Sequence, residues 1–231
     1  QLSLHRPHVK YWKSRGLAAC ELQPGIPSSW ANYASDHKCI DVLFYGQYHK
    51  RFFGNRNKLI EQLLQYKLDV GTDIQCHLQY KKQGLTIFRI PRLPQSRIEL
   101  PILIFPSEIV RNNSLPPIYG EELYKKISQS KIVVNAYTNW NKDFKSNMRL
   151  FEAIGLGAFL ISEEGNYPDG LEPGVDFYTY KDADELISKI EYVLSDWPRH
   201  AEIAKRTTKK ITRLYSKEKQ WDDFQTFISS M

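Results

Sequence analysis

Short apolar runs alternate with helix-length amphipathic stretches along most of this 231-residue chain. The run 41–46 has the length and the branched and aromatic residues of a buried strand, and apolar positions at helical spacing follow it from Leu59 to Tyr66. Further strands are predicted at 74–78, 85–90, 102–105, 131–135, 158–162 and 176–180, and further helices at 121–130, at 182–196 and, as a short helix, before the break at Gly155. This alternation predicts an α/β fold, a Rossmann-like doubly wound parallel sheet with helices on both faces.

The chain divides into three predicted parts. Residues 1–40 have little periodicity and are either a poorly structured tail or a segment leading into the domain; we favour the second because a strand follows. Residues 41–198 form the α/β domain, in which the proline-rich region 73–105 is interpreted as an insertion. Residues 199–231 are predicted to form basic helices that pack on this domain.

The stretch 146–164 combines a short helix, a glycine-containing break and a buried strand. Met148, Phe151 and Ile154 recur at i, i+3 and i+6, which predicts the core-facing side of the helix. Ser146 and Asn147 are candidate N-cap residues. Free backbone N–H groups and the positive end of the helix dipole would therefore gather at this point.

The opposite side of the same helix carries Arg149 and Glu152. Arg149 would bind a phosphate at the helix start. Glu152, one turn further, would accept hydrogen bonds from sugar hydroxyls. The alternative is an exposed i, i+3 ion pair on an ordinary amphipathic helix.

Three further candidates lie where predicted strands end. Gly46 allows close backbone approach or forms a simple turn, and Arg56 near the following helix start could meet a phosphate. Lys145, with Trp140 and Lys142, belongs to the loop after strand 131–135. These side chains face either a sugar or phosphate, or solvent.

The pattern Ser-x-x-Arg-x-Phe-Glu-Ala followed by Gly-Ala-Phe-Leu resembles the donor-binding motif in the C-terminal domain of GT-B glycosyltransferases, especially the group related to spore-maturation and cell-surface polysaccharide enzymes. The resemblance spans about residues 41–219 and is densest over 116–194. It implies that Glu152 binds the ribose of a nucleotide sugar and Arg149 its diphosphate. Tyr119 would stack on the base or pack against its own helix. Many retaining members carry a second glutamate where this chain has Phe144, so the stereochemical class stays open.

The resemblance also implies an activity: hexosyl transfer from a nucleotide-diphosphate sugar to a saccharide or lipid-linked acceptor in cell-surface glycan synthesis, without a metal or cofactor. A complete GT-B enzyme has two such domains, and this chain has room for one. Together with its start at Gln1, this predicts an excised or processed chain, or a partner chain that supplies the acceptor half. No catalytic base is assigned; Asp143 and Glu163 are possible. The alternative is a degenerate, non-catalytic module that binds a nucleotide or a protein.

Charge limits the class of partner. The net charge of +6 and the pI near 9.1 favour nucleotide diphosphates, acidic membrane surfaces or nucleic acid. Residues 199–219 hold eight Lys or Arg and two Glu, which form either a solvated face or a contact with anionic lipid. No nucleic-acid recognition motif accompanies the charge, so we expect no nucleic-acid partner.

Cysteine and histidine usage indicates a reducing compartment without a metal site. Cys20, Cys39 and Cys76 are odd in number and not closely spaced, which predicts reduced thiols. The six histidines lack paired metal-ligand spacing. With neither a signal-peptide pattern nor a membrane-length apolar run, we expect a cytoplasmic protein that contacts the membrane at most peripherally.

Overall fold

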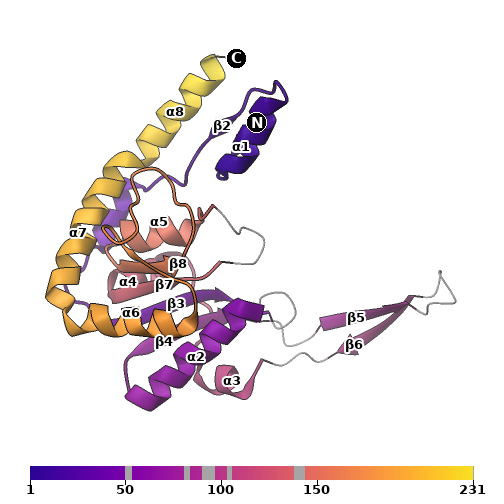
Figure 1. Ribbon diagram of the computed structural model, residues 1–231, viewed down its shortest axis with the longest axis vertical. Coiled ribbons are helices and arrows are strands. Elements are labelled where there is room, and N and C mark those ends of the chain that lie inside the picture. The colour runs from indigo at the N-terminus through magenta and orange to yellow at the C-terminus, as the bar shows by residue number, and fades with distance from the viewer. Residues whose placement is uncertain (50–53, 81–83, 90–96, 103–105, 138–143, 231) are drawn as a thin grey trace.

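A computed structural model describes residues 1–49, 54–80, 84–89, 97–102, 106–137 and 144–230 (Figure 1). Its centre is a five-stranded parallel sheet in the order β4–β3–β7–β8–β9. The strands are β3 (Ile40–Gln47), β4 (Ile74–Gln79), β7 (Ser130–Asn135), β8 (Phe159–Glu163) and β9 (Tyr178–Tyr180). The predicted Rossmann-like α/β class is confirmed.

Helices cover both faces of this sheet, as Figure 1 shows. One face is covered by α2 (Gly54–Val70) and α6 (Ala183–Ser195), and the other by α4 (Gly120–Ser128) and α5 (Met148–Gly155). Because side chains alternate along a strand, Val42 and Phe44 of β3 pack with α2 and α6, whereas Leu43 and Tyr45 pack with α4 and α5. Because β3 is buried on both faces of the sheet, residues 42–45 form a continuous apolar run and do not alternate with polar residues.

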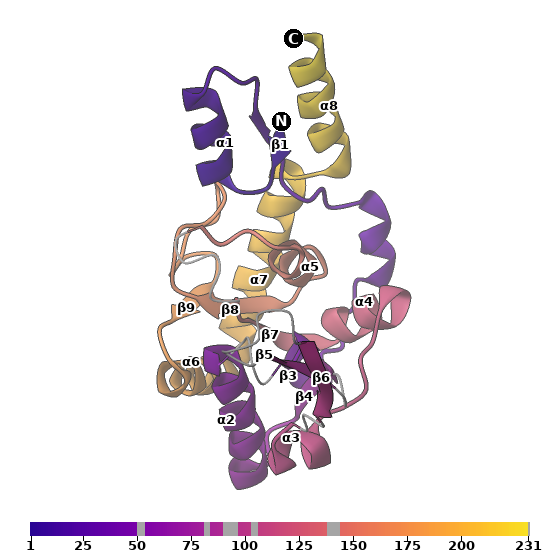
Figure 2. The same cartoon turned by 90° about the vertical axis from the view of Figure 1, so that its right-hand side faces the viewer.

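The strand order reverses beside β3. This strand pairs with β4 on one side and with β7 on the other, so the chain moves outward to β4 and then crosses back. In open α/β sheets such a switch point separates the carboxyl ends of two neighbouring strands and leaves a crevice for ligands. Figure 2 views the protein from the side of these strand ends.

Residues 1–40 are folded, so the alternative of a poorly structured tail is wrong. They contain β1 (Leu2–Ser3), α1 (Arg6–Ser14), β2 (Cys20–Glu21) and the 3-10 helix η1 (Ser28–Tyr33). Trp30 is buried against Gly155 at the end of α5. Ile26 exchanges backbone hydrogen bonds with Tyr215 and Lys217, where the last two helices meet.

The last two helices differ in how far they are buried. In α7 (Trp197–Leu214), Ala204 packs into the core on one face of the sheet and Ile211 into the core on the other. In α8 (Lys217–Ser229) no residue is buried, and Trp221 is 57% exposed. Figure 1 shows α8 extending away from the sheet.

The sequence-based prediction fails in the region before α4. The strand expected at 102–105 is instead β6 (Arg97–Ile102), which pairs antiparallel with β5 (Gly84–Arg89) in a separate two-stranded sheet; residues 103–105 lie outside the described residues. A short helix, α3 (Glu108–Asn113), was not predicted and packs on α2 through Val110.

Met148 was predicted to face the core and does not, because it is 47% exposed. It is the first residue of α5, directly after the cap. The buried side of the helix consists of Leu150, Phe151, Ala153 and Ile154.

Candidate functional site

The start of α5 is fixed by Asn147, one of the two predicted caps. Its Oδ1 accepts a hydrogen bond from the Leu150 N–H at 3.2 Å and another from the Tyr137 hydroxyl at 3.1 Å. Its Nδ2 donates to Asn135 Oδ1 at 3.0 Å, which ties the helix to the end of β7. The other candidate, Ser146, is buried and donates to Gln23 instead. Asn147 is therefore the N-cap.

Arg149 lies along the carboxyl end of β7. Its Nη1 donates to Asn135 Oδ1 at 3.1 Å and to the carbonyl oxygen of Ala136 at 3.4 Å. The guanidinium carbon stands 4.8 Å from the centre of the Tyr45 ring. Among the residues that the structure describes, the buried Nε of Arg149 has no hydrogen-bond partner.

Two arginines from opposite faces of the sheet meet over Gly46. A Cβ at Gly46 would lie 2.3 Å from Arg56 Nη2 and 2.6 Å from Arg149 Nη2, so these two nitrogens are within about 5 Å of each other. Gly46 also has a φ of +143°, which disfavours any side chain. The close approach of the two guanidiniums to the backbone therefore requires glycine at this position. The structure thus brings together Gly46, Arg56 and Arg149, three of the residues predicted from the sequence.

The electrostatics of this pair favour an anion. Arg56 is only 7% exposed, and burial, followed by the positive charge of Arg149, lowers the pKa of its guanidinium. Two cations held this close repel one another, and a bound anion would relieve both the repulsion and the desolvation. The arrangement is therefore chemically suited to a phosphate or diphosphate.

Glu152 is held by a residue that the sequence did not single out. Its Oε2 accepts a 2.7 Å hydrogen bond from the Tyr45 hydroxyl. Burial, and then the negative charge of Glu152, raises the pKa of Tyr45, so the phenol stays protonated as the donor. The structure describes both Glu152 and Arg149, and no ion pair of 4.0 Å or less joins them. Both side chains are half-buried. The alternative of an exposed ion pair is wrong.

Lys145 is buried and not part of a solvated loop. Its Nζ forms a 3.3 Å ion pair with Glu163 Oε2 and stands 4.7 Å from the centre of the Tyr137 ring. Glu163 Oε1 in turn accepts a hydrogen bond from the Tyr137 backbone N–H at 3.1 Å. Lys145 thus joins the loop before α5 to the end of β8.

The other candidates predicted from the sequence have no described contact with the two arginines or with Glu152. Tyr119 precedes α4 and is 62% exposed, so most of its ring is open to solvent. The candidates Trp140, Lys142 and Asp143 lie outside the described residues.

Phe144, the residue that stands where the resemblance would place a second glutamate, packs as an aromatic side chain. The side chain is buried, and the Arg6 guanidinium carbon stands 5.3 Å from the ring centre. The backbone of Phe144 also forms an isolated β-bridge with Asn166. The N-terminal segment therefore packs directly on the loop that leads into α5.

Asn135 organises the site, although it was not among the site residues predicted from the sequence. This buried residue closes β7 and contacts Arg149, Asn147 and, through a 3.1 Å hydrogen bond, Ser162 of β8. The signal in the sequence was a polar amide at the end of an otherwise apolar strand, at the carboxyl edge where ligands bind.

Among the residues that the structure describes, no group of three or more His, Cys, Asp or Glu side chains is arranged to hold a metal ion. Within the same ranges, none of the helices combines the length and the apolar character needed to cross a bilayer.

Comparison with known proteins gives one family and a set of similar folds. A protein family described as glycosyl transferase-like matches residues 56–226. No curated protein matches the chain. Solved structures with a similar fold include HepE of Anabaena in complex with UDP, at 12% identity and a TM-score of 0.66, covering 100% of this chain and 63% of that one.

Two more solved structures show the same likeness. A point mutant of TarM of S. aureus, in complex with Fondaparinux, alpha-GlcNAc-glycerol and UDP, has 12% identity and a TM-score of 0.63, covering 98% of this chain and 43% of that chain. The C-terminal domain of LpcC, a glycosyl transferase group 1 family protein from Francisella tularensis, has 14% identity and a TM-score of 0.52, covering 92% and 95%. The chain therefore spans less than two thirds of HepE and TarM.

Proposed function

Because the chain belongs to the glycosyl transferase-like family, we propose that it is the donor-binding half of a GT-B glycosyltransferase and binds a nucleotide-diphosphate sugar. The observation that carries this proposal is the meeting of Arg56 and Arg149 over Gly46, beside the capped start of α5. The UDP complexes of HepE and TarM, whose folds are similar, support it.

Each residue of the site has a role in this proposal. The diphosphate lies between the two arginines and the backbone N–H groups at the start of α5, which stabilise the negative charge of the leaving nucleoside diphosphate. Glu152, oriented by Tyr45, accepts hydrogen bonds from the ribose hydroxyls. Tyr119 supplies an exposed ring for the base. No metal or cofactor is required, since these cationic groups stabilise the leaving group.

The finer assignment is part of the same proposal. The chain would transfer a hexosyl group to a saccharide or lipid-linked acceptor in cell-surface glycan synthesis, as a member of the group related to spore-maturation enzymes. An N-terminal domain or a partner chain would supply the acceptor half, because the chain spans only part of HepE and TarM. The division into residues 1–40, 41–198 and 199–231 remains a prediction.

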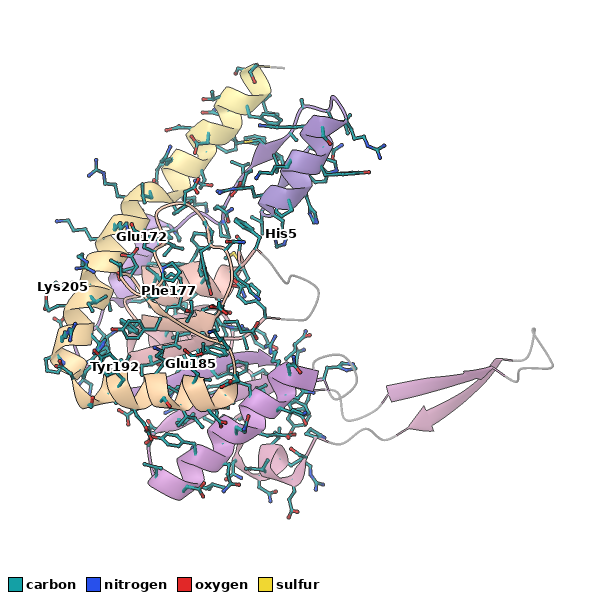
Figure 3. All side chains as sticks on the ribbon, in the orientation of Figure 1. His5, Glu172, Phe177, Glu185, Tyr192 and Lys205 are labelled. Carbon is teal, nitrogen blue, oxygen red and sulfur yellow. The ribbon has the colours of Figure 1, made fainter. Side chains whose placement is uncertain are left out.

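Location at the cytoplasmic face of a membrane is proposed on the charge of α7. Lys210 is engaged by Asp176 at 2.7 Å, and Arg206 donates to the Val175 carbonyl oxygen at 3.0 Å. Other cations of this helix are exposed, and Lys205 points away from the protein body (Figure 3). They are suited to a peripheral contact with anionic lipid.

A second candidate function rests on Phe144. A buried phenylalanine replaces the carboxylate that many retaining members use, which favours a degenerate domain that binds a nucleotide without turnover. Tight nucleotide-sugar binding without product formation, measured when any acceptor domain is present, would support this alternative.

Thermal unfolding with UDP, GDP, dTDP, CMP and their sugars tests the proposal. A ligand at 100 times its Kd stabilises the native state by about 2.7 kcal/mol, which is readily measured. We expect selective stabilisation by one diphosphate, lost in Arg149→Ala and Glu152→Ala but retained in Arg213→Ala, which removes an exposed arginine of α7. No stabilisation of the wild-type chain by any ligand would contradict donor binding by this chain.

A further inference from the structure

A cavity of about 520 Å³ opens at the carboxyl ends of β8 and β9, between the first turns of α2 and α6. Figure 3 shows Glu185 of α6 near this end of the helix. The polar side chains of the cavity wall come from four different elements or their ends, and include Asn55, Lys58, Gln62, Glu163, Glu164 and Asp182. Its volume lies within the range of small-ligand pockets.

The wall combines donors and acceptors of both charges. Three carboxylates would repel a phosphate, and the lysines Lys58 and Lys181 would repel a free cation. A neutral ligand with many hydroxyl groups suits such a wall, because each hydroxyl both donates and accepts a hydrogen bond. The chemistry therefore favours a pyranose ring over an anion or a metal.

Glu163 connects this cavity to the candidate donor site. One carboxylate oxygen accepts a hydrogen bond from the Tyr137 backbone N–H, and the other accepts one from Lys145 Nζ. A carboxylate has about four acceptor positions, so about two are left unused by the residues that the structure describes, and the side chain is 26% exposed. The Tyr137 hydroxyl donates to Asn147, so a single residue bridges the cavity wall and the start of α5.

The backbone brings this carboxylate next to the loop that leads into α5. Phe144 bridges to Asn166, and the Lys145 N–H donates to the Asn166 carbonyl oxygen at 2.7 Å. The segment leading into α5 and the segment following β8 therefore lie side by side. Glu163 therefore lies beside the segment that leads into α5, and Lys145 of that segment binds it directly.

We propose that the cavity binds a pyranose ring and that Glu163 accepts hydrogen bonds from its hydroxyls. This inference rests on the proposed function of the neighbouring diphosphate site. The ring belongs either to the sugar that is transferred or to a saccharide acceptor, and both sources present the same hydroxyl chemistry.

Calorimetric titration of the whole chain separates the sources. The ligands are the nucleoside diphosphate that stabilises the chain most in thermal unfolding, its glucose, galactose, mannose and N-acetylglucosamine conjugates, and the diphosphate together with each free sugar. The variants are Glu163→Gln and, on the opposite wall, Asn55→Ala. Glu218→Gln is the matched control, since it removes the same charge from the exposed surface of α8.

For a transferred sugar, we expect both cavity variants to bind the preferred conjugate about tenfold more weakly while the diphosphate alone binds as before. For an acceptor sugar, the conjugates also bind as before, and the affinity for the free sugar in the presence of diphosphate falls about tenfold. Equal loss for diphosphate and conjugate, or no loss for any sugar, would overturn the inference. No binding of any diphosphate to the wild-type chain would overturn the proposed function and the inference with it.

Discussion

The hydroxyl of Tyr45 donates a 2.7 Å hydrogen bond to Oε2 of Glu152, although 107 positions separate the two residues in the sequence. This contact joins the end of β3 to α5 across the switch point of the sheet. It orients the Glu152 carboxylate beside Arg149. The structure describes both residues and shows no ion pair between them. The half-buried carboxylate lies on the same edge of the sheet as the two arginines.

Replacing Tyr45 with phenylalanine should weaken nucleotide binding selectively. Tyr45→Phe removes the hydroxyl that orients Glu152, at a cost of about 1 kcal/mol in unfolding free energy. We expect weaker binding of a nucleoside diphosphate and unchanged binding of inorganic pyrophosphate, which has no ribose for Glu152 to contact. Calorimetry with the two ligands measures the difference.

Tyr11→Phe is the control for this variant, because Tyr11 is exposed on α1, far from β3 in sequence. An equal loss of affinity for pyrophosphate in Tyr45→Phe would contradict the assignment of Glu152 to the ribose, since the defect would then lie in the diphosphate site.

Gly46→Ala should remove anion binding. The new Cβ would lie 2.3 Å from Arg56 Nη2 and 2.6 Å from Arg149 Nη2, so both guanidiniums would have to move. The positive φ adds strain of about 1–3 kcal/mol. We expect reduced unfolding free energy together with loss of the thermal shift caused by diphosphate.

Gly71→Ala separates the two effects of that substitution. Gly71 also has a positive φ, of +77°, but nothing lies within 4 Å of the position that its Cβ would take. The Gly71→Ala chain should therefore lose stability by backbone strain and keep diphosphate binding. Retained binding in Gly46→Ala would show that the arginines do not hold the anion.

The sheet, and the position of Gly46 and Arg149 at one of its edges, follow from local sequence rules. Apolar runs located the five strands, and the switch point of a doubly wound sheet brings Gly46 and Arg149 to one edge. The cap at Asn147 was predicted from its residue type and position, although Ser146 was an equal candidate. These features depend on periodicity and on chain topology, which the sequence displays directly.

The hydrogen-bond network could not be predicted in the same way. The contacts of Asn135 and the pairing of Tyr45 with Glu152 depend on how α5 is rotated against the sheet, which local patterns do not specify. The exposure of Met148 has the same origin, since a short helix has several apolar positions that compete for the core. The docking of Trp30 on Gly155 likewise depends on tertiary packing between distant segments.

Arg56→Met should stabilise the empty chain and abolish its response to diphosphate. Burial and the charge of Arg149 both lower the pKa of Arg56, so the cation is held in the native state at an energetic cost. Replacing it with an apolar side chain of similar length should raise Tm by about 2–4 °C, which corresponds to about 1 kcal/mol in a protein of this size.

Differential scanning calorimetry with and without diphosphate measures both effects, and Arg213→Met, at an exposed position, is the control. A large fall in Tm of the empty Arg56→Met chain would show that the residue is structural, and that the repulsion between the arginines is outweighed by its other contacts.

Lys38 lies away from the ligand edge and links two helix ends. Its Nζ donates to the Ser128 carbonyl oxygen at 2.6 Å, at the end of α4, and to the Gly157 carbonyl oxygen at 2.9 Å, just after α5. Burial lowers the pKa of Lys38 to about 8, and the nearby Asp36 only partly opposes this. The ammonium form is therefore less favourable in the native chain than in the unfolded one.

This shift predicts that stability depends on pH with a definite sign. Between about pH 8 and the ordinary lysine pKa of about 10.4, the unfolded chain holds a proton on Lys38 that the native chain has released, so the unfolding free energy rises with pH. Urea denaturation of wild type and Lys38→Met at pH 7, 8, 9 and 10 should show their difference growing in favour of wild type above pH 8. Lys205→Met, at an exposed position of α7, should give a constant difference from wild type. A constant difference for Lys38→Met as well would mean that Lys38 keeps an ordinary pKa and that its two carbonyl contacts offset its burial.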